Sequence, residues 1–287
     1  MLTLVTGATG EVGRRFVPRL LQRTAPGDTV RVIVRDAERG ERFAALGAEV
    51  VVGDLREPDD VTKAVAGTDA VVNIAAAFRG VPDDEMWAVN RDAALLLGRT
   101  AVDSGTGRFV QVGTNLAYGA GRGRPLTEDD VTVPGGPMWG AYAQSKAAAD
   151  EGLLALHRTH GLDVRIGTLA FVYGEGDPHL TQVMRWVGEW AATQRLAMVH
   201  HADVAQGLLR LLFAPGPAGR RYNFSDDAPV TAVDLHRLNG VPVQAGMADR
   251  VDPDPWYGLM SNLRARDELG HRPLYPSVWT ARDAGAL

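Results

Sequence analysis

Two side chains that could exchange a proton with a substrate lie one helical turn apart in this sequence. Tyr142 and Lys146 are spaced i, i+4 within a helical pattern, so both should project from the same face. A tyrosine hydroxyl has a pKa near ~10, and a neighbouring ammonium lowers that pKa toward the working range. Lysine is scarce, because 28 of the 30 basic residues are arginine and Lys63 is the other lysine. We therefore predict an acid–base role for Tyr142, assisted by Lys146, with a surface helix pair as the alternative.

A glycine-rich turn lies between an expected strand at 2–5 and an expected helix at 14–23. Its three glycines are spaced three residues apart. The first permits a tight bend, the second lets the backbone approach a pyrophosphate, and the third lets helix and strand pack closely. Amides at the start of the helix would bind the anion. This pattern favours a dinucleotide site over a purely structural turn. The predicted contacts are Gly7, Thr9, Gly10, Glu11, Val12 and Gly13.

The end of the second expected strand bears on the choice between NAD and NADP. A carboxylate there accepts a hydrogen bond from the ribose 2′-hydroxyl, whereas an arginine pairs with a 2′-phosphate. A strand that ends at Val34 places Arg35 at the deciding position, and we favour NADP for that reason. A shift of one residue would favour Asp36 and NAD, and Arg35 could also be a solvated strand-end charge. After the third strand, Asp54 could accept from the adenine amino group or simply begin a helix.

These residues require strands whose ends meet at one edge of a sheet. Short apolar runs alternate with helical patterns from residue 2 to residue 169. Such runs are typical of a parallel sheet covered on both faces, so we predict an α/β fold with a Rossmann-type doubly wound sheet. After Tyr173 the pattern breaks into segments rich in Pro and Gly, which indicates a smaller irregular lobe. The predicted domains are a dinucleotide-binding domain at 1–174, to which 197–225 returns, and a substrate lobe at 175–196 and 226–287.

Composition excludes several classes of protein. The chain has 287 residues, 45% of them apolar, and no cysteine, so it can bury a large core but cannot be a disulfide scaffold. A net charge of −5 argues against a nucleic-acid-binding surface. No run approaches the ~20 apolar residues of a membrane span, and the first residues lack the pattern of a signal peptide. We expect a cytoplasmic protein that acts on a small molecule.

Further motifs occur in a characteristic order along nearly the whole chain. They include Gly53-Asp54-Leu55, Asn73-Ile74-Ala75-Ala76-Ala77, Val89-Asn90, Phe109–Thr114, Tyr142–Lys146, Val172-Tyr173-Gly174 and Val199–Val204. Together with the glycine turn, this series resembles the extended short-chain dehydrogenase/reductase family, in its epimerase/dehydratase-like branch. The resemblance implies that Tyr142 and Lys146 are catalytic and that Thr114 holds the substrate oxygen and stabilises alkoxide charge. Gly113-Thr114 departs from the pair of serines that the family more often shows, which alters the adjacent pocket.

The resemblance also implies cofactor contacts and a quaternary structure. Beyond the glycine turn, the predicted cofactor residues are Arg35, Asp36, Asp54, Leu55, Ala75, Ala76, Ala77, Asn90, Tyr142, Lys146, Leu169, Phe171 and Val172. Asn90 would order the expected helix at 84–104 and a water near the lysine, with simple helix packing as an equal alternative. A homodimer would form through the helices at 84–104 and 141–160. No metal site is predicted, since His200 and His201 lack a third ligand at metal spacing.

Two reactions fit these residues. In one, hydride moves between NADP(H) and the carbonyl or secondary alcohol of a substrate; in the other, a tightly bound NAD(P) oxidises and re-reduces a sugar nucleotide during epimerisation or dehydration. Only 25 residues separate Gly174 from His200, a short stretch for a nucleotide pocket, and residues 134–140 bring apolar bulk toward the helix of Tyr142. We favour a reductase of a small, fairly apolar substrate, with a catalytically silent NADP-binding regulator as a third alternative. The predicted pocket comprises Phe78, Thr114, Leu116, Met138, Trp139, Tyr142, Val172 and Trp186.

Two other conspicuous groups receive structural interpretations. Val183, Trp186, Val187 and Trp190 form a stripe at helical spacing, which predicts the core of the lobe. Glu128 lies in an acidic loop and is interpreted as a loop cap.

Overall fold

The computed structural model describes residues 1–287 except Pro134, Pro137 and Pro217. The chain divides into two compact units. The first comprises residues 1–114, 140–167 and 207–221, and the second comprises residues 115–139, 168–206 and 222–287. The domain boundaries that we predicted from the sequence differ from these limits and stay a prediction. No helix in the described part of the chain is long and apolar enough to cross a membrane.

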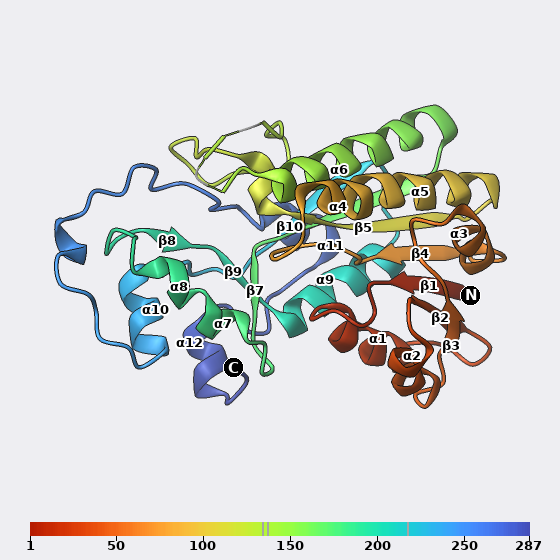
Figure 1. Cartoon of the computed structure of the whole chain (residues 1–287), viewed down its shortest axis with the longest axis horizontal. Helices are drawn as coiled ribbons and strands as arrows, with labels where there is room; N and C mark the ends of the chain where they lie inside the picture. The colour runs from red at the N-terminus through yellow and green to blue at the C-terminus, as the bar shows by residue number, and fades with distance from the viewer. Residues whose placement is uncertain (134, 137, 217) are drawn as a thin grey trace. The chain divides into compact units, whose positions relative to one another are not determined.

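One sheet has seven strands, and most of its residues belong to the first unit (Figure 1). Its order is β10-β6-β5-β4-β1-β2-β3. The strands are β1 (Leu2–Thr6), β2 (Thr29–Val34), β3 (Glu49–Val52), β4 (Ala70–Asn73), β5 (Arg108–Thr114), β6 (Asp163–Leu169) and β10 (Arg220–Phe224). The pairings of β1 with β2 and β4, of β2 with β3 and of β4 with β5 are parallel. The strand order reverses between β1 and β4, where ligands bind in open α/β sheets. The predicted Rossmann-type α/β fold is confirmed.

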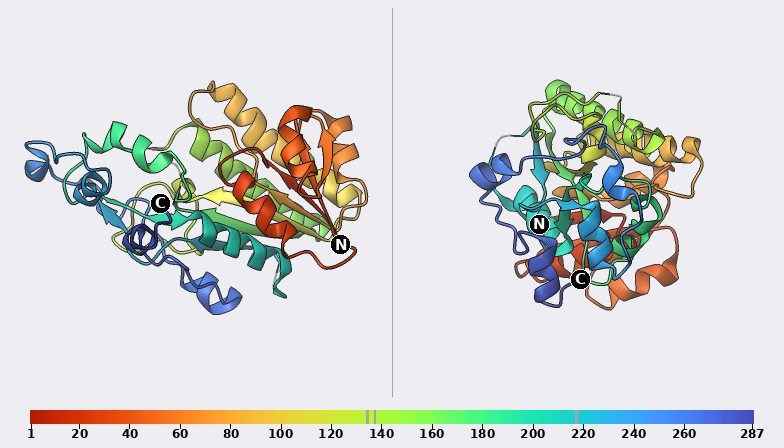
Figure 2. Two further views of the ribbon diagram at one scale, coloured as in Figure 1. Left: turned by 90° about the horizontal axis from the view of Figure 1, so that it is seen from below. Right: turned by 90° about the vertical axis from the view of Figure 1, so that its left-hand side faces the viewer.

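Helices cover both faces of this sheet. They are α1 (Gly13–Leu21), α2 (Ala37–Ala44), α3 (Pro58–Val65), α4 (Asp83–Trp87), α5 (Ala94–Asp103), α6 (Ala141–His160) and α9 (His201–Phe213). In Figures 1 and 2, α1 and α2 lie on the side of the sheet opposite α5 and α6. Glycines let α5 and α6 approach closely, because a Cβ at Gly98 would lie 2.6 Å from Leu153 and one at Gly152 would lie 2.5 Å from Leu95.

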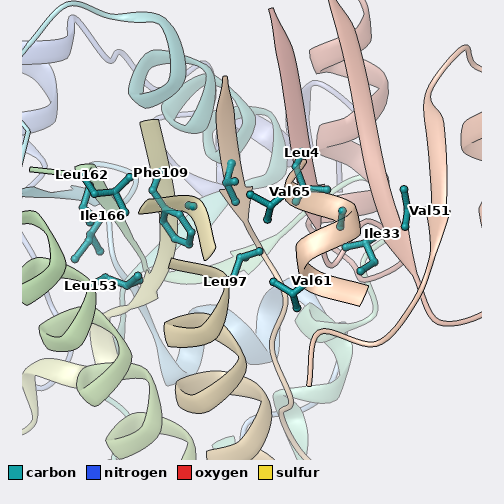
Figure 3. Packing of buried hydrophobic residues seen from close by; sticks show 14 of the residues in the cluster. Leu4, Ile33, Val51, Val61, Val65, Leu97, Phe109, Leu153, Leu162 and Ile166 are labelled. Atoms are coloured by element: carbon teal, nitrogen blue, oxygen red, sulfur yellow. The ribbon is translucent and has the colours of Figure 1, made fainter. Parts of the chain in front are cut away.

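The main core lies between the sheet and the layer of α3, α5 and α6. Leu4 and Phe109 project from the strands, and Val61, Leu97 and Leu153 project from the three helices (Figure 3). All five are fully buried. The apolar strand runs of the sequence therefore pack as the pattern predicts, and this packing fixes the strand ends that carry the candidate site.

One expected helix differs from the prediction. Residues 84–104 were expected as a single α-helix, but the structure has α4, a π-helical segment at Ala88–Ala93 and then α5. Asn90 lies buried within the π-helical segment. Such π-turns occur where a side chain is directed away from the regular helical register, frequently at functional sites.

The second unit consists of shorter elements. They are the 3-10 turn at Asn115–Tyr118, β7 (Phe171–Tyr173), α7 (His179–Gln182), α8 (Met184–Val187), β8 (Arg195–Leu196), β9 (Met198–His200), β11 (Val230–Thr231), α10 (Ala232–Leu238), the 3-10 turn at Met247–Asp249, α11 (Leu263–Leu269) and α12 (Val278–Asp283). A second core of buried residues joins several of them, from β7 to α12, and includes Val183 and Val187 from the predicted stripe. Trp190 packs against this core, whereas Trp186 is 39% exposed, so the stripe prediction is wrong for Trp186.

Candidate active site

The glycine turn between β1 and α1 is tightly packed. Gly7 has φ +65, and a Cβ there would lie 2.6 Å from the Ala75 backbone nitrogen. A Cβ at Gly13 would lie 2.1 Å from the Gly7 carbonyl oxygen. At Gly10, by contrast, the nearest atom would be 3.4 Å away, and this residue is exposed. Packing therefore requires two of the three glycines, and the predicted role of Gly10 in the approach of the cofactor stays a prediction.

The start of α1 offers amides to an anion. Its N-cap residue, Val12, supplies no side-chain acceptor to the first turn. The Glu11 carboxylate instead accepts hydrogen bonds at 2.6 Å from both Arg14 and Arg15. Thr9 is partly exposed at the bend. An uncapped helix start of this kind, at the end of β1, is suited to a phosphate.

Buried polar side chains join the carboxyl ends of β1 and β4 to the middle of β5 beside this turn. Thr6 donates from its hydroxyl to Asn73 at 2.5 Å, and Asn73 donates to Gln111 at 2.8 Å. Thr6 also accepts a hydrogen bond from the backbone N–H of Ala75. The network links the ends of β1 and β4 to each other and to the middle of β5. We did not single out Thr6 or Gln111 from the sequence, because only the strand order brings them together.

The residues after β2 are those on which the prediction of NADP depends. β2 ends at Val34, as the interpretation in favour of Arg35 requires. Arg35 and Asp36 are both exposed. Asp36 is the N-cap of α2, and its carboxylate accepts a hydrogen bond from the backbone N–H of Glu38 at 2.9 Å. The Asp36 carboxylate thus already accepts one hydrogen bond within the protein. Arg35 is the first residue after the end of β2.

Asp54 is held in a turn after β3. Its carboxylate accepts hydrogen bonds from the backbone N–H of Arg56 at 2.9 Å and from the Arg56 guanidinium at 2.6 Å. These contacts lower the pKa of Asp54, and the charge of Arg35 lowers it further. Leu55 packs against the main core. Asp54 therefore has the turn-forming contacts of our alternative interpretation, and its contact with adenine stays a prediction.

Asn90 anchors the segment that follows β4. Its amide oxygen accepts from the backbone N–H of Ala77 at 2.8 Å, and its amide nitrogen donates to the Ala77 carbonyl at 2.9 Å. The amide nitrogen also donates to Ser145 on α6 at 3.1 Å. Asn90 thus joins the π-helical segment, the residues at 75–77 and α6. Its side chain positions backbone that we predict to line the cofactor.

The predicted catalytic side chains come together at the end of β5. Tyr142 and Lys146 lie on successive turns of α6, and the Thr114 side chain hydrogen-bonds to the Tyr142 hydroxyl. Thr114 and Lys146 are buried, at 7% and 1% exposure. Among the described residues, the Lys146 ammonium nitrogen has no hydrogen-bond partner.

The acidity of Tyr142 differs from the prediction. Burial of the hydroxyl raises the pKa of Tyr142 to about 12, and the hydrogen bond from Thr114 and the charge of Arg79 oppose this rise. The predicted lowering by Lys146 is not among the influences on the hydroxyl. Burial also lowers the pKa of Lys146. The structure therefore holds Tyr142 as a neutral phenol, because desolvation outweighs the neighbouring charges.

An aromatic and a cationic side chain border Tyr142. The ring of Phe78 lies 4.2 Å from the Tyr142 ring, measured between centroids. The Arg79 guanidinium lies 4.6 Å from the centre of the Phe78 ring. Arg79 has φ 45, an unusual backbone conformation for a residue with a side chain. Phe78 was predicted as a pocket residue, whereas Arg79 was missed, and an uncommon backbone angle leaves no signal in the sequence.

The other predicted residues belong to the second unit. They are Leu116, Met138, Trp139, Leu169, Phe171, Val172 and Trp186. Leu169 is buried at the end of β6, and Phe171 and Val172 are partly buried in β7. Met138 is exposed, and its backbone N–H donates to the Tyr257 hydroxyl at 3.3 Å. In the predicted apolar segment 134–140, Pro134 and Pro137 lie outside the described residues. The pocket roles of these residues stay a prediction.

Three further polar residues of the second unit have structural contacts. His200 bonds to the carbonyl of Ala286 at 2.8 Å, and His201 bonds to the carboxylate of Asp177 at 2.7 Å. Glu128 accepts a hydrogen bond from the backbone N–H of Asn223 at 2.8 Å, so it ties its loop to β10.

Known proteins resemble the chain over most of its length. A model of the NAD dependent epimerase/dehydratase family matches residues 3–224. UDP-glucose 4-epimerase of Vibrio cholerae is 30% identical over 285 residues, which cover 94% of this chain and 84% of the epimerase. The dTDP-glucose 4,6-dehydratase of Streptomyces antibioticus is 29% identical over 300 residues, covering 95% and 88%. A 4-hydroxy-2-methyl-3-oxo-4-farnesyl-3,4-dihydroquinoline-1-oxide ketoreductase of Stigmatella aurantiaca is 29% identical over 240 residues, covering 80% and 70%.

Solved structures share the fold. A short-chain dehydrogenase/reductase superfamily protein of Agrobacterium tumefaciens, solved with bound NAD, gives a TM-score of 0.79 at 23% identity, covering 99% of this chain and 96% of its own. DesIV, the dTDP-glucose 4,6-dehydratase of Streptomyces venezuelae, solved with NAD and TYD bound, gives 0.76 at 26% identity, covering 99% and 97%.

Proposed function

Because the chain belongs to the NAD dependent epimerase/dehydratase family, within the extended short-chain dehydrogenases/reductases, we propose that it is an NADP(H)-dependent reductase of a small, largely apolar carbonyl compound. The observation that carries the proposal is the hydrogen bond between Thr114 and Tyr142, one helical turn from Lys146. Two hydroxyls that meet at the end of a strand can both bind one substrate oxygen. The reverse oxidation of a secondary alcohol would use the same groups.

Tyr142 acts as the general acid in this proposal. When bound, the reduced cofactor supplies the hydride that adds to the carbonyl carbon. Tyr142 donates its proton to the carbonyl oxygen as negative charge develops there, and Thr114 stabilises that charge through its hydroxyl. A pKa raised to about 12 keeps Tyr142 protonated at neutral pH, which suits the reductive direction. Lys146 would contact the ribose hydroxyls of the cofactor.

The preference for NADP is supported by the end of β2. Arg35 directly follows Val34 and is exposed, so its guanidinium is available to a 2′-phosphate. The Asp36 carboxylate, which would otherwise accept from a ribose hydroxyl, caps α2. NAD is the alternative cofactor and is bound in the solved neighbours from Agrobacterium tumefaciens and Streptomyces venezuelae.

An apolar substrate is supported by the ring beside the reacting hydroxyl. Phe78 is 36% exposed although it packs against Tyr142 and lies beside the Arg79 guanidinium, so part of this apolar side chain is available for contact. The quinoline ketoreductase from Stigmatella aurantiaca, whose name describes a farnesylated aromatic substrate, fits this chemistry.

The alternative is a sugar-nucleotide epimerase or dehydratase, which several relatives favour. A dehydratase must remove a proton from carbon and protonate a leaving hydroxyl, and it therefore requires acid–base groups in addition to the tyrosine. In this chain, Thr114 is followed by the uncharged Asn115 and Leu116. Among the described residues, Asp150 is the carboxylate that influences Tyr142, and it lies two turns away on α6. These features support a reductase over a dehydratase.

The stoichiometry of the cofactor tests the proposal. We expect a panel of ketones to include substrates that consume NADPH in proportion to the alcohol formed. An epimerase or dehydratase would convert nucleotide sugars with no net consumption of NADPH, and this result would overturn the proposal. A protein that binds NADPH and turns over neither class would be the silent regulator.

A further inference from the structure

Asp150 lies on the same face of α6 as Tyr142 and Lys146. Tyr142, Lys146 and Asp150 are spaced i, i+4 and i+8 within Ala141–His160, so they share one face of the helix. Lys146 lies between the other two, one turn from each. The reaction proposed above assigns roles to Tyr142 and Lys146 and leaves Asp150 without one.

Lys146 and Asp150 are both removed from solvent. Lys146 is 1% exposed and Asp150 is 2% exposed. Among the described residues, neither the Lys146 Nζ atom nor the Asp150 Oδ1 atom has a hydrogen-bond partner. A buried ammonium is strongly destabilised unless an opposite charge compensates it. Asp150 is the group whose charge acts on Lys146, and it favours the ammonium form while burial favours the neutral amine.

The charged groups around Asp150 come from two elements. Arg221 on β10 and Lys146 lower the pKa of Asp150, while Glu151 raises it slightly. Burial is the largest influence and raises the pKa to about 6. Arg221 donates a hydrogen bond to Glu151 at 2.6 Å. Of the two neighbouring carboxylates, Glu151 is exposed and Asp150 is buried. Above about pH 6, Asp150 is therefore an anion one helical turn from Lys146.

We propose that Asp150 is a positioning residue for the reaction, which holds the buried Lys146 side chain in its ammonium form. The inference rests on the proposed function, because the ammonium matters for a reductase only when it serves the cofactor and Tyr142. Asp150 touches neither of the reacting groups. It acts through Lys146, by compensating a charge that burial would otherwise remove.

The scarcity of lysine makes the proposal directly measurable. Protein labelled with ¹³C at the lysine ε-carbon gives signals from Lys63 and Lys146 alone, and Lys63→Arg leaves the second. The position of this signal is followed from about pH 5 to about pH 11 to obtain the titration midpoint of Lys146. Asp150→Asn should lower the midpoint by at least ~1 pH unit, which corresponds to about tenfold in the acid constant. An unchanged midpoint would overturn the proposal.

Two matched variants separate charge from structure. Asp150→Glu retains the carboxylate and should keep the midpoint within about 0.5 pH units of the wild type. Glu151→Gln removes the exposed neighbouring carboxylate and should leave both the midpoint and the rate of turnover unchanged. A fall with Glu151→Gln as large as that with Asp150→Asn would contradict a specific role for Asp150.

The unsubstituted protein supplies the test if Asp150→Asn fails to fold. Because the two groups are coupled, the Lys146 signal of the wild type should show a second inflection near pH 6, where Asp150 ionises. A single inflection would overturn the inference. Absence of coupling in a protein that reduces ketones would refute this inference alone. Coupling in a protein that reduces none would refute the proposed function alone.

Discussion

Arg35 is the single residue on which the choice of cofactor depends most. It follows the last residue of β2, and its charge also acts on Asp54 at the end of β3. Arg35→Ala should raise the KM for NADPH by about 10- to 100-fold, since a charge-assisted hydrogen bond to phosphate contributes about 1.5–3 kcal/mol. The KM for NADH should change little. Steady-state kinetics with both cofactors measure the effect, and an unchanged preference for NADPH would refute the role of Arg35.

Tyr142 shows what a residue pattern can and cannot predict. The spacing of Tyr142 and Lys146 correctly indicated two side chains on one face of a helix. The direction of the pKa shift was wrong, because burial of the hydroxyl outweighs the charges around it. Phe78, whose ring packs against Tyr142, lies far from it in the sequence, and the spacing along α6 holds no information about such a contact.

Two glycines of the turn between β1 and α1 should have different roles, Gly13 in packing and Gly10 in the binding of the cofactor. Gly13→Ala places a Cβ 2.1 Å from the Gly7 carbonyl, so α1 must move away from β1. We expect this variant to lose roughly 1–3 kcal/mol of stability and to bind NADPH at least about tenfold more weakly.

Gly10→Ala is the matched control, because its Cβ meets no atom closer than 3.4 Å. This variant should keep its stability within roughly 0.5 kcal/mol and lose affinity for NADPH alone. Thermal unfolding and NADPH titration of both proteins give the two quantities. Equal stability losses would refute the assignment of separate roles to the two glycines.

Among the elements, buried strands were predicted well and the helix at 84–104 was not. Apolar runs identify strands that are covered on both faces, and β2 ends at Val34, as expected. The π-helical segment arises at Asn90, whose amide bonds to Ala77 and to Ser145. These partners are distant in the sequence, so helical periodicity could not predict the irregular turn.

At the scale of the whole molecule, Asp226 makes stability depend on pH. Burial in the second unit raises its pKa to about 9, and repulsion by Asp227 adds to the rise. In the unfolded chain an aspartate ionises near ~3.9. The unfolded chain therefore loses this proton first, and the contribution of Asp226 to stability falls as the pH rises from about 4 to about 9.

Asp226→Asn removes this titration. At pH 8 the free energy of unfolding of the variant should exceed that of the wild type by roughly 1–3 kcal/mol, and each kcal/mol corresponds to ~2–4 °C in Tm. Near pH 4 the variant should show no gain in stability. Asp227→Asn relieves the repulsion on Asp226 but also loses the pair with Arg266 at 2.6 Å, so its gain at pH 8 should be smaller than that of Asp226→Asn. Thermal unfolding at the two pH values measures both, and a gain for Asp226→Asn that is the same at each would contradict the account.

The sequence predicted some parts of the candidate site and missed others. The residues of the first unit lie on strand ends and on α6, and local motifs found them. The network of Thr6, Asn73 and Gln111 escaped, because its members belong to three strands that neighbour one another only in the folded sheet.

The most direct test of the reductase is a single reaction in which NADPH oxidation and alcohol formation are measured together, with Tyr142→Phe as the comparison. The wild type should consume one NADPH for each alcohol formed. Tyr142→Phe should lose turnover by at least about 100-fold while its affinity for NADPH stays near that of the wild type. Substrate conversion without net oxidation of NADPH, or undiminished turnover by Tyr142→Phe, would contradict it.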